Sequence, residues 1–344
     1  MQQKKAKEKN LNFRDCDEIN VHMETTASFL QKLRAAGIEI RTENGKLVCN
    51  APKGAITPEI AKKIKQKKSA IISFLQQTAT DKWSSLVAIQ PNGRQLPFFC
   101  FHGAGGNVLN YSVLVPYLGQ DQPLYGLQSR GLDGTTPPLE SIESMAAHYV
   151  REIITIQPHG PYYLGGGSMG GMVALEAAQQ LQKAGETIGI LVMFDTIGPN
   201  QEVTPGGRLI HRIRQHSMLE LLTYAKDKVT ESNLNKQKMA DCLEYRKRGE
   251  PLPHDLRFWF IEKMNYIAMG NYKYSVFDGK ITLLKGTDEE GGLWSDPLRG
   301  WQDMTTQRLE IHEIPGHHDT LVEEPLLGRK LAEYLKQAQN NNQE

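Results

Sequence analysis

The stretch of sequence that most restricts the fold is GGGSMGG, in which Ser168 stands among glycines at positions 165–167 and 170–171. The residues before it, YYL, favour a strand, and those after it are rich in helix formers. A sharp turn from strand to helix strains the backbone of the residue at its apex, and its closest neighbours must lack a β-carbon. A flexible linker is the alternative, but linkers do not usually join aromatic residues to an apolar helix. We therefore predict a strand, a tight turn that presents the Ser168 hydroxyl, and a helix.

Short apolar runs alternate with helical patterns over most of the chain beyond Trp83. The strand candidates are PFFCF, PLYGLQ, YYLGG, IGILVMFD, ITLLKG and LEIHEIPG. Continuous apolar runs are typical of parallel strands covered on both faces, and helical patterns such as SIESMAAHYVREIITI separate them. We therefore predict an α/β fold with a mostly parallel central sheet. From about residue 200 to residue 274 there is no strand pattern, and helical segments replace it. An insertion of this length predicts a lid over the site that contains Ser168.

The composition changes near residues 76–85, which predicts two folded parts. The predicted divisions are a disordered N-terminus at 1–23, a small α+β domain at 24–77, a linker at 78–85 and a large domain at 86–344. We call residues 24–77 the N-terminal module.

The N-terminal module has the pattern helix, hairpin, helix. Its first helical pattern ends at Gly37, and side chains then alternate on both sides of Asn44-Gly45, a strong signal for a tight hairpin turn. The second helical pattern, ITPEIAKKIKQKKSAIISFLQQ, begins with Thr57 as a predicted N-cap and Pro58 at the first helical position.

Charge and composition exclude several classes of function. The net charge is +1 and 39% of the residues are hydrophobic, so nothing favours nucleic acid or a membrane surface as a partner. No run approaches the roughly 18 apolar residues that span a bilayer. The basic N-terminus lacks the apolar core of a secretory signal, and the 4 cysteines are scattered without a C-x-x-C pair. We expect a cytoplasmic protein with reduced thiols and no metal site.

A serine hydroxyl needs a base to become a nucleophile at neutral pH, and in α/β-hydrolases the partners follow in the order Ser, acid, His. Asp195 ends the run IGILVMFD, and Asp288 follows the next strand candidate; the spacing alone leaves both open as the acid. The base is expected in EIPGHHDTLVEEP, which supplies His317 and His318.

An oxyanion formed by attack of Ser168 needs backbone donors. The run FHGAGG follows the first core strand candidate, where this fold has its oxyanion loop, so His102 is expected to belong to the loop. The predicted donors are the N–H groups of Ala104 and Met169.

Together these motifs resemble the thioesterase domains of nonribosomal peptide and polyketide synthases. The resemblance covers about residues 86–335 and includes LVAIQPNGRQLPFFCFHGAGG, LYGLQSRGLDG, MFDT, DPLRGW and the final G-x-H-x-x-L. It implies an α/β-hydrolase fold in which Asp195 is the acid and His318 the base. Gly167 departs from the family, because many members have an aromatic residue or histidine before the serine, and this departure implies a wider pocket.

Residues 27–75 resemble a tubulysin-type N-terminal docking domain. The matching stretch is LQKLRAAGIEIRTENGKLVCNAPKGAITPEIAKKIKQKKSAIISFL. Such domains capture a short C-terminal peptide, often acidic, of an upstream synthase subunit along the hairpin edge. Five lysines give the module a positive face, namely Lys62, Lys63, Lys65, Lys67 and Lys68. A solvated helix face is an equally good account of any one of them.

The resemblance implies a thioesterase that releases an acyl or peptidyl chain from the phosphopantetheine of a carrier protein, by hydrolysis or cyclisation through an acyl-Ser168 intermediate. The carrier is expected to arrive in trans, because the chain lacks a D-S-[LI] attachment site, and no cofactor is expected to bind the chain itself. The alternatives are a stand-alone esterase or lipase, an editing thioesterase, and a non-catalytic docking adaptor.

Overall fold

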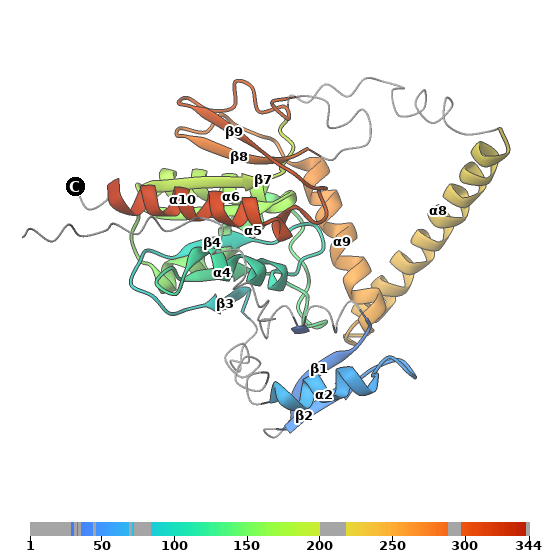
Figure 1. Ribbon diagram of the computed structural model, residues 1–344. Coiled ribbons are helices and arrows are strands. Elements are labelled where there is room, and N and C mark those ends of the chain that lie inside the picture. The colour runs from blue at the N-terminus through green and yellow to red at the C-terminus, as the bar shows by residue number, and fades with distance from the viewer. Residues whose placement is uncertain are drawn as a thin grey trace, which may run out of the picture.

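The computed structural model forms a small N-terminal unit and a larger unit built on a central sheet (Figure 1). It describes residues 29–30, 33, 36–43, 46–68, 71, 84–199, 218–287 and 297–341, with the backbone alone at 42–43, 218–232 and 254. In this part of the chain, no helix combines the length and the apolar character needed to cross a membrane.

The central sheet has seven strands in the order β3-β5-β4-β6-β7-β8-β9. Their bounds are β3 Leu86–Gln90, β4 Phe98–Phe101, β5 Leu124–Leu127, β6 Tyr162–Gly167, β7 Ile188–Phe194, β8 Ile281–Gly286 and β9 Leu309–Ile314. All neighbours are parallel except β3 and β5, so the predicted mostly parallel sheet is confirmed. The edge strand β3 was not among the strand candidates; it is mostly half-buried and pairs antiparallel with β5.

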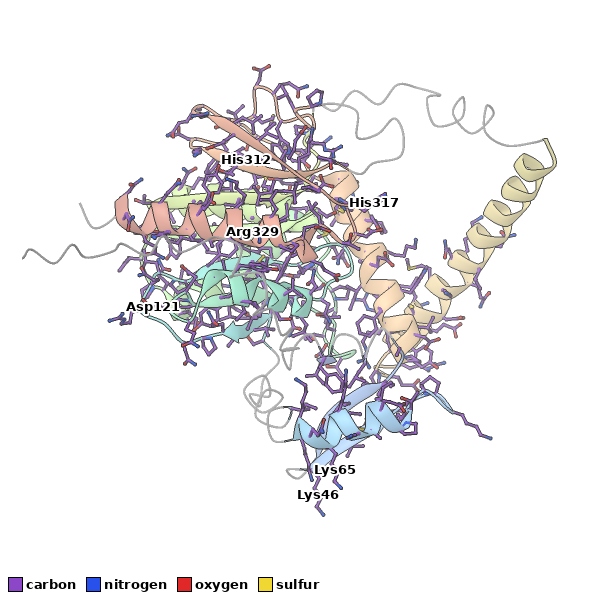
Figure 2. All side chains as sticks on the ribbon, viewed as in Figure 1. Lys46, Lys65, Asp121, His312, His317 and Arg329 are labelled. Atoms are coloured by element: carbon purple, nitrogen blue, oxygen red, sulfur yellow. The ribbon has the colours of Figure 1, made fainter. Side chains whose placement is uncertain are left out.

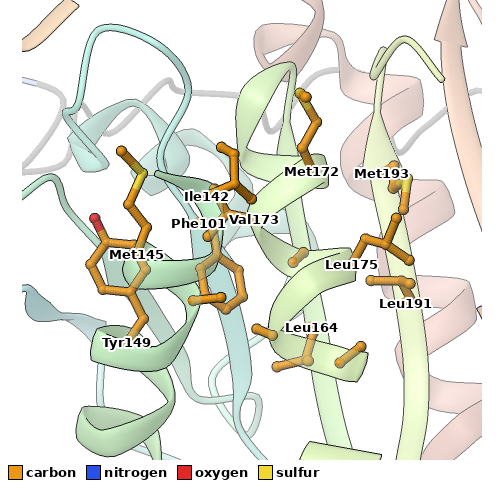
Figure 3. Packing of buried hydrophobic residues seen from close by; sticks show 14 of the residues in the cluster. Phe101, Ile142, Met145, Tyr149, Leu164, Met172, Val173, Leu175, Leu191 and Met193 are labelled. Atoms are coloured by element: carbon orange, nitrogen blue, oxygen red, sulfur yellow. The ribbon is translucent and has the colours of Figure 1, made fainter. Parts of the chain in front are cut away.

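Helices cover both faces of this sheet. One face carries α5 (Ile142–Ile156) and α6 (Met169–Lys183), and the other carries the 3-10 helix η1 (Leu109–Leu114), α4 (Val115–Leu118) and α10 (Pro325–Asn341). The side chains of β4 alternate between the faces, as a strand requires: Phe99 and Phe101 join the α5–α6 cluster, whereas Phe98 and Cys100 join the α10 cluster. Figure 3 shows α5 and α6 side chains packed with Phe101 and Leu164.

Two long helices lie in the region predicted to form the lid. α8 (Met218–Lys247) and α9 (His254–Asn271) are joined by a short turn and diverge from there, so that the other end of α8 points away from the sheet (Figure 1). Near the turn they share a small core of Cys242, Leu252 and Phe260. Residues 200–217 lie outside the described part of the chain.

The N-terminal module has a core of its own. Strands β1 (Glu39–Glu43) and β2 (Lys46–Asn50) pair antiparallel, with α2 (Pro58–Gln66) following. The buried residues of this core are Phe29, Leu30, Leu33, Ile38, Ile40 and Ile71. The Thr57 hydroxyl accepts a 3.3 Å hydrogen bond from the N–H of Ile60, which confirms the predicted N-cap.

The second helical pattern of the module is helical where the structure describes it. α2 ends at Gln66, Lys67 forms a turn, and Lys68 and Ile71 are again helical, with the Ile71 N–H bonded at 2.8 Å to the Lys67 carbonyl. Ile71 belongs to the core of the module, and the rest of the predicted helix lies outside the described residues. The predicted turn Asn44-Gly45, the N-terminus 1–23 and most of the linker 78–85 lie outside the described residues.

Candidate active site

Ser168 stands at the sharp turn between β6 and α6, where its backbone has φ 55° and ψ −123°. A left-handed φ is costly for a residue with a β-carbon, and the surrounding contacts hold it there. A β-carbon on Gly166 would come within 2.6 Å of the Gly170 backbone, and one on Gly170 would overlap the Phe101 carbonyl oxygen. The glycines thus let α6 approach β4 and β6 closely, as the sequence pattern predicted. We call residues 166–170 the elbow.

Tyr111 holds the elbow in place by hydrogen bonds, although no sequence motif indicated this residue. Its hydroxyl donates a 2.7 Å hydrogen bond to the Phe101 carbonyl and accepts a 2.9 Å bond from the Gly167 N–H. Its ring also packs edge-on against Phe194, with the ring centroids 6.3 Å apart. Tyr111 is buried, so it ties together the carboxyl ends of β4, β6 and β7 in the absence of competing water.

Asp195 and His318 are in direct contact. Nδ1 of His318 lies 2.8 Å from Oδ2 of Asp195, although 123 positions separate the two residues along the chain. Asp195 follows β7 and has φ 49°, and the Ser168 N–H bonds at 2.8 Å to the carbonyl of Phe194, directly before it. His318 follows β9 after Gly316, whose φ of 131° turns the chain toward Asp195. The nucleophile and acid candidates therefore end neighbouring strands, with the histidine brought in from a third.

The second oxygen of the Asp195 carboxylate is held by two further donors. Oδ1 accepts a 3.0 Å bond from the Gly286 N–H and lies 3.3 Å from Nη2 of Arg299. Nη2 of Arg299 also donates at 3.1 Å to the Gly286 carbonyl, and the Arg299 side chain is 1% exposed. Burial alone would raise the pKa of Asp195, but hydrogen bonds from His318 and Gly286 and the charge of Arg299 together lower it.

Arg299 was missed as a site residue. It belongs to the run DPLRGW, which had been recognised only as part of a family resemblance. The same run supplies Trp301, whose indole N–H donates a 2.8 Å bond to the Thr196 carbonyl, while the Thr196 hydroxyl donates at 2.9 Å to the Ser168 carbonyl. This segment therefore supports both Asp195 and the elbow.

The predicted oxyanion loop, residues 102–106, follows β4. Gly103 to Gly106 form a turn closed by a 2.9 Å bond from the Gly106 N–H to the Gly103 carbonyl. Ala104 lies in this turn, and Met169 opens α6. Because β4 and β6 are adjacent parallel strands, the two predicted backbone donors lie at the same end of the sheet as Ser168.

The other candidate acid and histidines are placed differently. His102 is fully buried, with Nε2 lying 2.7 Å from the Tyr149 hydroxyl and Nδ1 2.7 Å from the Gly103 carbonyl. Burial lowers the pKa of His102 to about 4, so it is neutral at physiological pH and supports the loop. His317 is exposed, beside α9 in Figure 2, and Asp288 lies outside the described residues.

The predicted docking lysines all lie on or just beyond α2. The side chains of Lys62, Lys63, Lys65 and Lys68 are exposed, whereas Lys67 is half-buried, with Nζ lying 5.9 Å from the centre of the Phe29 ring. Lys65 and Lys46 of β2 project in the same direction (Figure 2). Across the described ranges, no group of three or more His, Cys, Asp or Glu residues is arranged to hold a metal ion.

Two family models match the chain. The thioesterase domain model covers residues 96–333, and the TubC N-terminal docking domain model covers residues 27–77.

Curated relatives include much longer synthases. A dimodular nonribosomal peptide synthase of Bacillus subtilis is 31% identical over 264 residues, which are 73% of this chain and 11% of that protein. Indigoidine synthase of Dickeya dadantii is 40% identical over 124 residues, 36% of this chain and 8% of that enzyme. The chain therefore spans only a small part of these relatives.

Solved structures share the fold. The NocB thioesterase domain, in covalent complex with a fluorophosphonate nocardicin G analog, is 22% identical with a TM-score of 0.52, over 74% of this chain and 98% of that one. A four-domain nonribosomal peptide synthetase bound to AMP and glycine is 23% identical with a TM-score of 0.53, over 78% of this chain and 21% of that one.

Proposed function

This chain belongs to the thioesterase domain family of nonribosomal peptide and polyketide synthases and carries a TubC-type docking domain, and we propose that it releases a carrier-bound acyl or peptidyl chain. The scissile bond is the thioester that joins this chain to the phosphopantetheine arm of a carrier protein. The observation that carries the proposal is the contact between His318 and Asp195. Asp195 directly follows Phe194, whose carbonyl accepts a hydrogen bond from the Ser168 N–H, so the contact lies beside the elbow.

In the proposed first half-reaction, Ser168 Oγ attacks the thioester carbonyl while Nε2 of His318 takes its proton. Asp195 holds the imidazole through Nδ1 and stabilises the imidazolium that forms. The tetrahedral intermediate collapses when His318 returns the proton to the departing phosphopantetheine thiol. The products are the free thiol of the carrier and an acyl-Ser168 ester.

In the second half-reaction, His318 takes a proton from the incoming nucleophile and returns it to Ser168 Oγ. Water gives a free acid, whereas a hydroxyl or amine of the same acyl chain gives a lactone or lactam. In both halves we assign the oxyanion to the backbone N–H groups of Ala104 and Met169. Loss of one such donor typically lowers kcat by about 10²–10³-fold.

Intact mass spectrometry after incubation with a loaded carrier protein tests this proposal. Wild type should gain the mass of the acyl group on Ser168, or return free carrier with a released product. Ser168→Ala should leave the carrier loaded, and Ser112→Ala, a change at a buried serine of η1, serves as the matched control. If Ser168→Ala unloads the carrier as fast as wild type, the acyl-serine mechanism is wrong.

Substrate preference separates the proposal from its rivals. A stand-alone esterase or lipase should turn over small p-nitrophenyl esters better than carrier thioesters, and an editing thioesterase should prefer a carrier that bears a short, stalled acyl group. A docking adaptor should react with none of them. A release thioesterase should prefer the carrier that bears the full-length chain.

We further propose that the N-terminal module binds the C-terminal peptide of an upstream synthase subunit. Among the residues that the structure describes, β1 and β2 form a sheet of two strands, to which a peptide strand could be added, and the exposed lysines of α2 favour an acidic partner. Titration of the whole chain with acidic C-terminal peptides of candidate subunits tests this.

Charge reversal sharpens the docking experiment. The double variant Lys62→Glu/Lys65→Glu should weaken peptide binding and flatten its salt dependence, whereas Lys183→Glu, an exposed change at the end of α6, should leave both unchanged. If no peptide binds saturably, or if both variants bind like wild type, this assignment of the module is wrong.

A further inference from the structure

Helix α9 rests directly on the oxyanion loop. Asn265 of α9 is fully buried, and its Nδ2 donates a 2.7 Å hydrogen bond to the carbonyl of Ala104. One turn earlier, Ile261 touches the same loop, because a β-carbon built on Gly106 would lie 3.0 Å from its Cγ2. Positions four apart share one face of a helix, so this face of α9 is seated on the turn at residues 103–106.

The bonded carbonyl belongs to the one peptide of this turn that can reverse. Ala104 and Gly105 occupy the two central positions of a four-residue turn, and the peptide between them can rotate between the type I and type II forms. Type II needs a positive φ at the third position, which glycine adopts at little cost. Gly105 has no atom within 4 Å of an added β-carbon, and its φ lies outside the left-handed range here. The turn is therefore not type II, and glycine is the residue that would adopt the type II form most readily.

The orientation of this peptide matters to an oxyanion beside it. In a trans peptide the C=O and N–H point in opposite directions, so Asn265 holds the Ala104 carbonyl toward α9 and the Gly105 N–H away from it. Reversal would put the Ala104 carbonyl where the Gly105 N–H now points. The negative end of that dipole would then stand beside the Ala104 N–H and oppose the charge that develops in the transition state.

We propose that Asn265 is a positioning residue of the reaction, which fixes the Ala104–Gly105 peptide so that the oxyanion hole is formed only while α9 rests on the loop. This rests on the proposed function, because it assigns Ala104 to the oxyanion hole. It also gives α9 a role beyond covering the site, since the seating of this helix sets the electrostatics of the turn. The effect falls on the transition state more than on the bound substrate, so kcat should change and KM should not.

The test compares Asn265→Leu and Asn265→Asp with wild type in the full chain. Leucine removes the donor at similar size, and aspartate keeps the shape but presents an acceptor to the Ala104 carbonyl. We expect each to lower kcat on the carrier thioester about 10- to 100-fold with KM within about twofold, somewhat less than the loss of a whole oxyanion donor. Labelling of Ser168 by a small alkyl fluorophosphonate should slow by a similar factor. Asn271→Leu, at the exposed end of α9, is the matched control and should label like wild type.

A second change separates positioning from general damage to the fold. Gly105→Ala disfavours the positive φ of the reversed peptide, so in the Asn265→Leu background it should recover part of the lost labelling rate. A purely structural loss would not be recovered in this way. Urea unfolding shows which of the two Asn265 variants is folded. The kcat and the Ser168 labelling rate of a folded variant then decide whether Asn265 positions the Ala104–Gly105 peptide.

Two results would overturn the proposal in different ways. If wild type is labelled at Ser168 and a folded Asn265 variant is labelled equally fast, Asn265 does not position the hole, although the proposed function stands. If wild type itself is not labelled, the serine mechanism fails, and the role of Asn265 in it fails too.

Discussion

Nδ1 of His318 and Oδ2 of Asp195 lie 2.8 Å apart, while the other oxygen of the same carboxylate is held by Gly286 and Arg299. One oxygen of the Asp195 carboxylate thus contacts Gly286 and Arg299, and the other contacts the His318 imidazole. This arrangement fixes the orientation of the His318 ring through Nδ1, as the aspartate does in the Asp–His pair of serine hydrolases.

Asp195→Asn should lower kcat by about 10³–10⁴-fold, because an amide in place of the carboxylate favours the wrong imidazole tautomer and stabilises no imidazolium. Steady-state release from a loaded carrier measures the effect. Asp288→Asn is the matched control and should retain wild-type activity. The reverse order of the two variants would transfer the role of the acid to Asp288.

Arg299→Met should raise the pKa of the Asp195 carboxyl. Burial opposes the ionised form of Asp195, and the Arg299 charge is one of the causes that keep its pKa low, so loss of the cation raises that pKa. NMR titration of the Asp195 carboxyl carbon measures the change, and Arg299→Lys, which retains a cation, should keep the pKa near its wild-type value. An unchanged pKa in Arg299→Met would show that Arg299 does not control Asp195.

The substitution Arg299→Met should also destabilise the fold. A carboxylate whose pKa is lowered in the folded state adds stability above its unfolded pKa, and this stability is lost as the pH falls through the folded pKa. Loss of one partner of a buried ion pair costs about 3 kcal/mol. Urea unfolding of Arg299→Met should therefore show a deficit of this order at pH 7 that narrows toward pH 3. A deficit independent of pH would point to lost packing instead.

Tyr111→Phe should keep the packing of the ring and lose both hydrogen bonds of the hydroxyl, to Phe101 and from Gly167. Loss of these two buried hydrogen bonds should cost about 1–3 kcal/mol of stability. Because these groups flank the elbow, labelling of Ser168 should also slow. Tyr117→Phe, a tyrosine of α4, is the control, and equal behaviour of the two variants would contradict a role for the Tyr111 hydroxyl.

Gly170→Ala and Gly167→Ala should differ sharply, although both lie in the elbow. A β-carbon on Gly170 would overlap the Phe101 carbonyl oxygen, whereas one on Gly167 meets the Tyr111 hydroxyl oxygen at an ordinary 3.5 Å. We expect Gly170→Ala to lose several kcal/mol or fail to fold, and Gly167→Ala to fold with near wild-type stability. Thermal unfolding and circular dichroism measure the difference. A stable Gly170→Ala would show that the elbow is more adaptable than its contacts indicate.

The elbow and the parallel strands β4 to β9 could be predicted because each is encoded by neighbouring residues. Glycine spacing, apolar runs and the loops after them all lie within short windows, and the parallel sheet follows from their alternation. Asp195 could not be separated from Asp288 by spacing alone, since both follow buried strand candidates. The family resemblance favoured the residue that the structure places against His318.

Tyr111, Arg299 and Asn265 could not be predicted because their partners are distant in the sequence. Arg299 bonds to a carboxylate 104 positions away, and Asn265 to a carbonyl 161 positions away. No local periodicity distinguishes a buried arginine or asparagine from a solvated one.

The separate cores of the chain bear on how such proteins can be recombined. The cluster around Phe29, Ile38 and Ile71 shares no member with the clusters on either face of the large sheet, among the residues described. A module of foreign origin could therefore replace residues 24–77 without disturbing the packing beneath Ser168. The proposed partner choice by the module and the proposed bond cleavage by the large domain would then be inherited independently. A recombination breakpoint in the linker would be enough to change the partner and leave the cleavage unchanged.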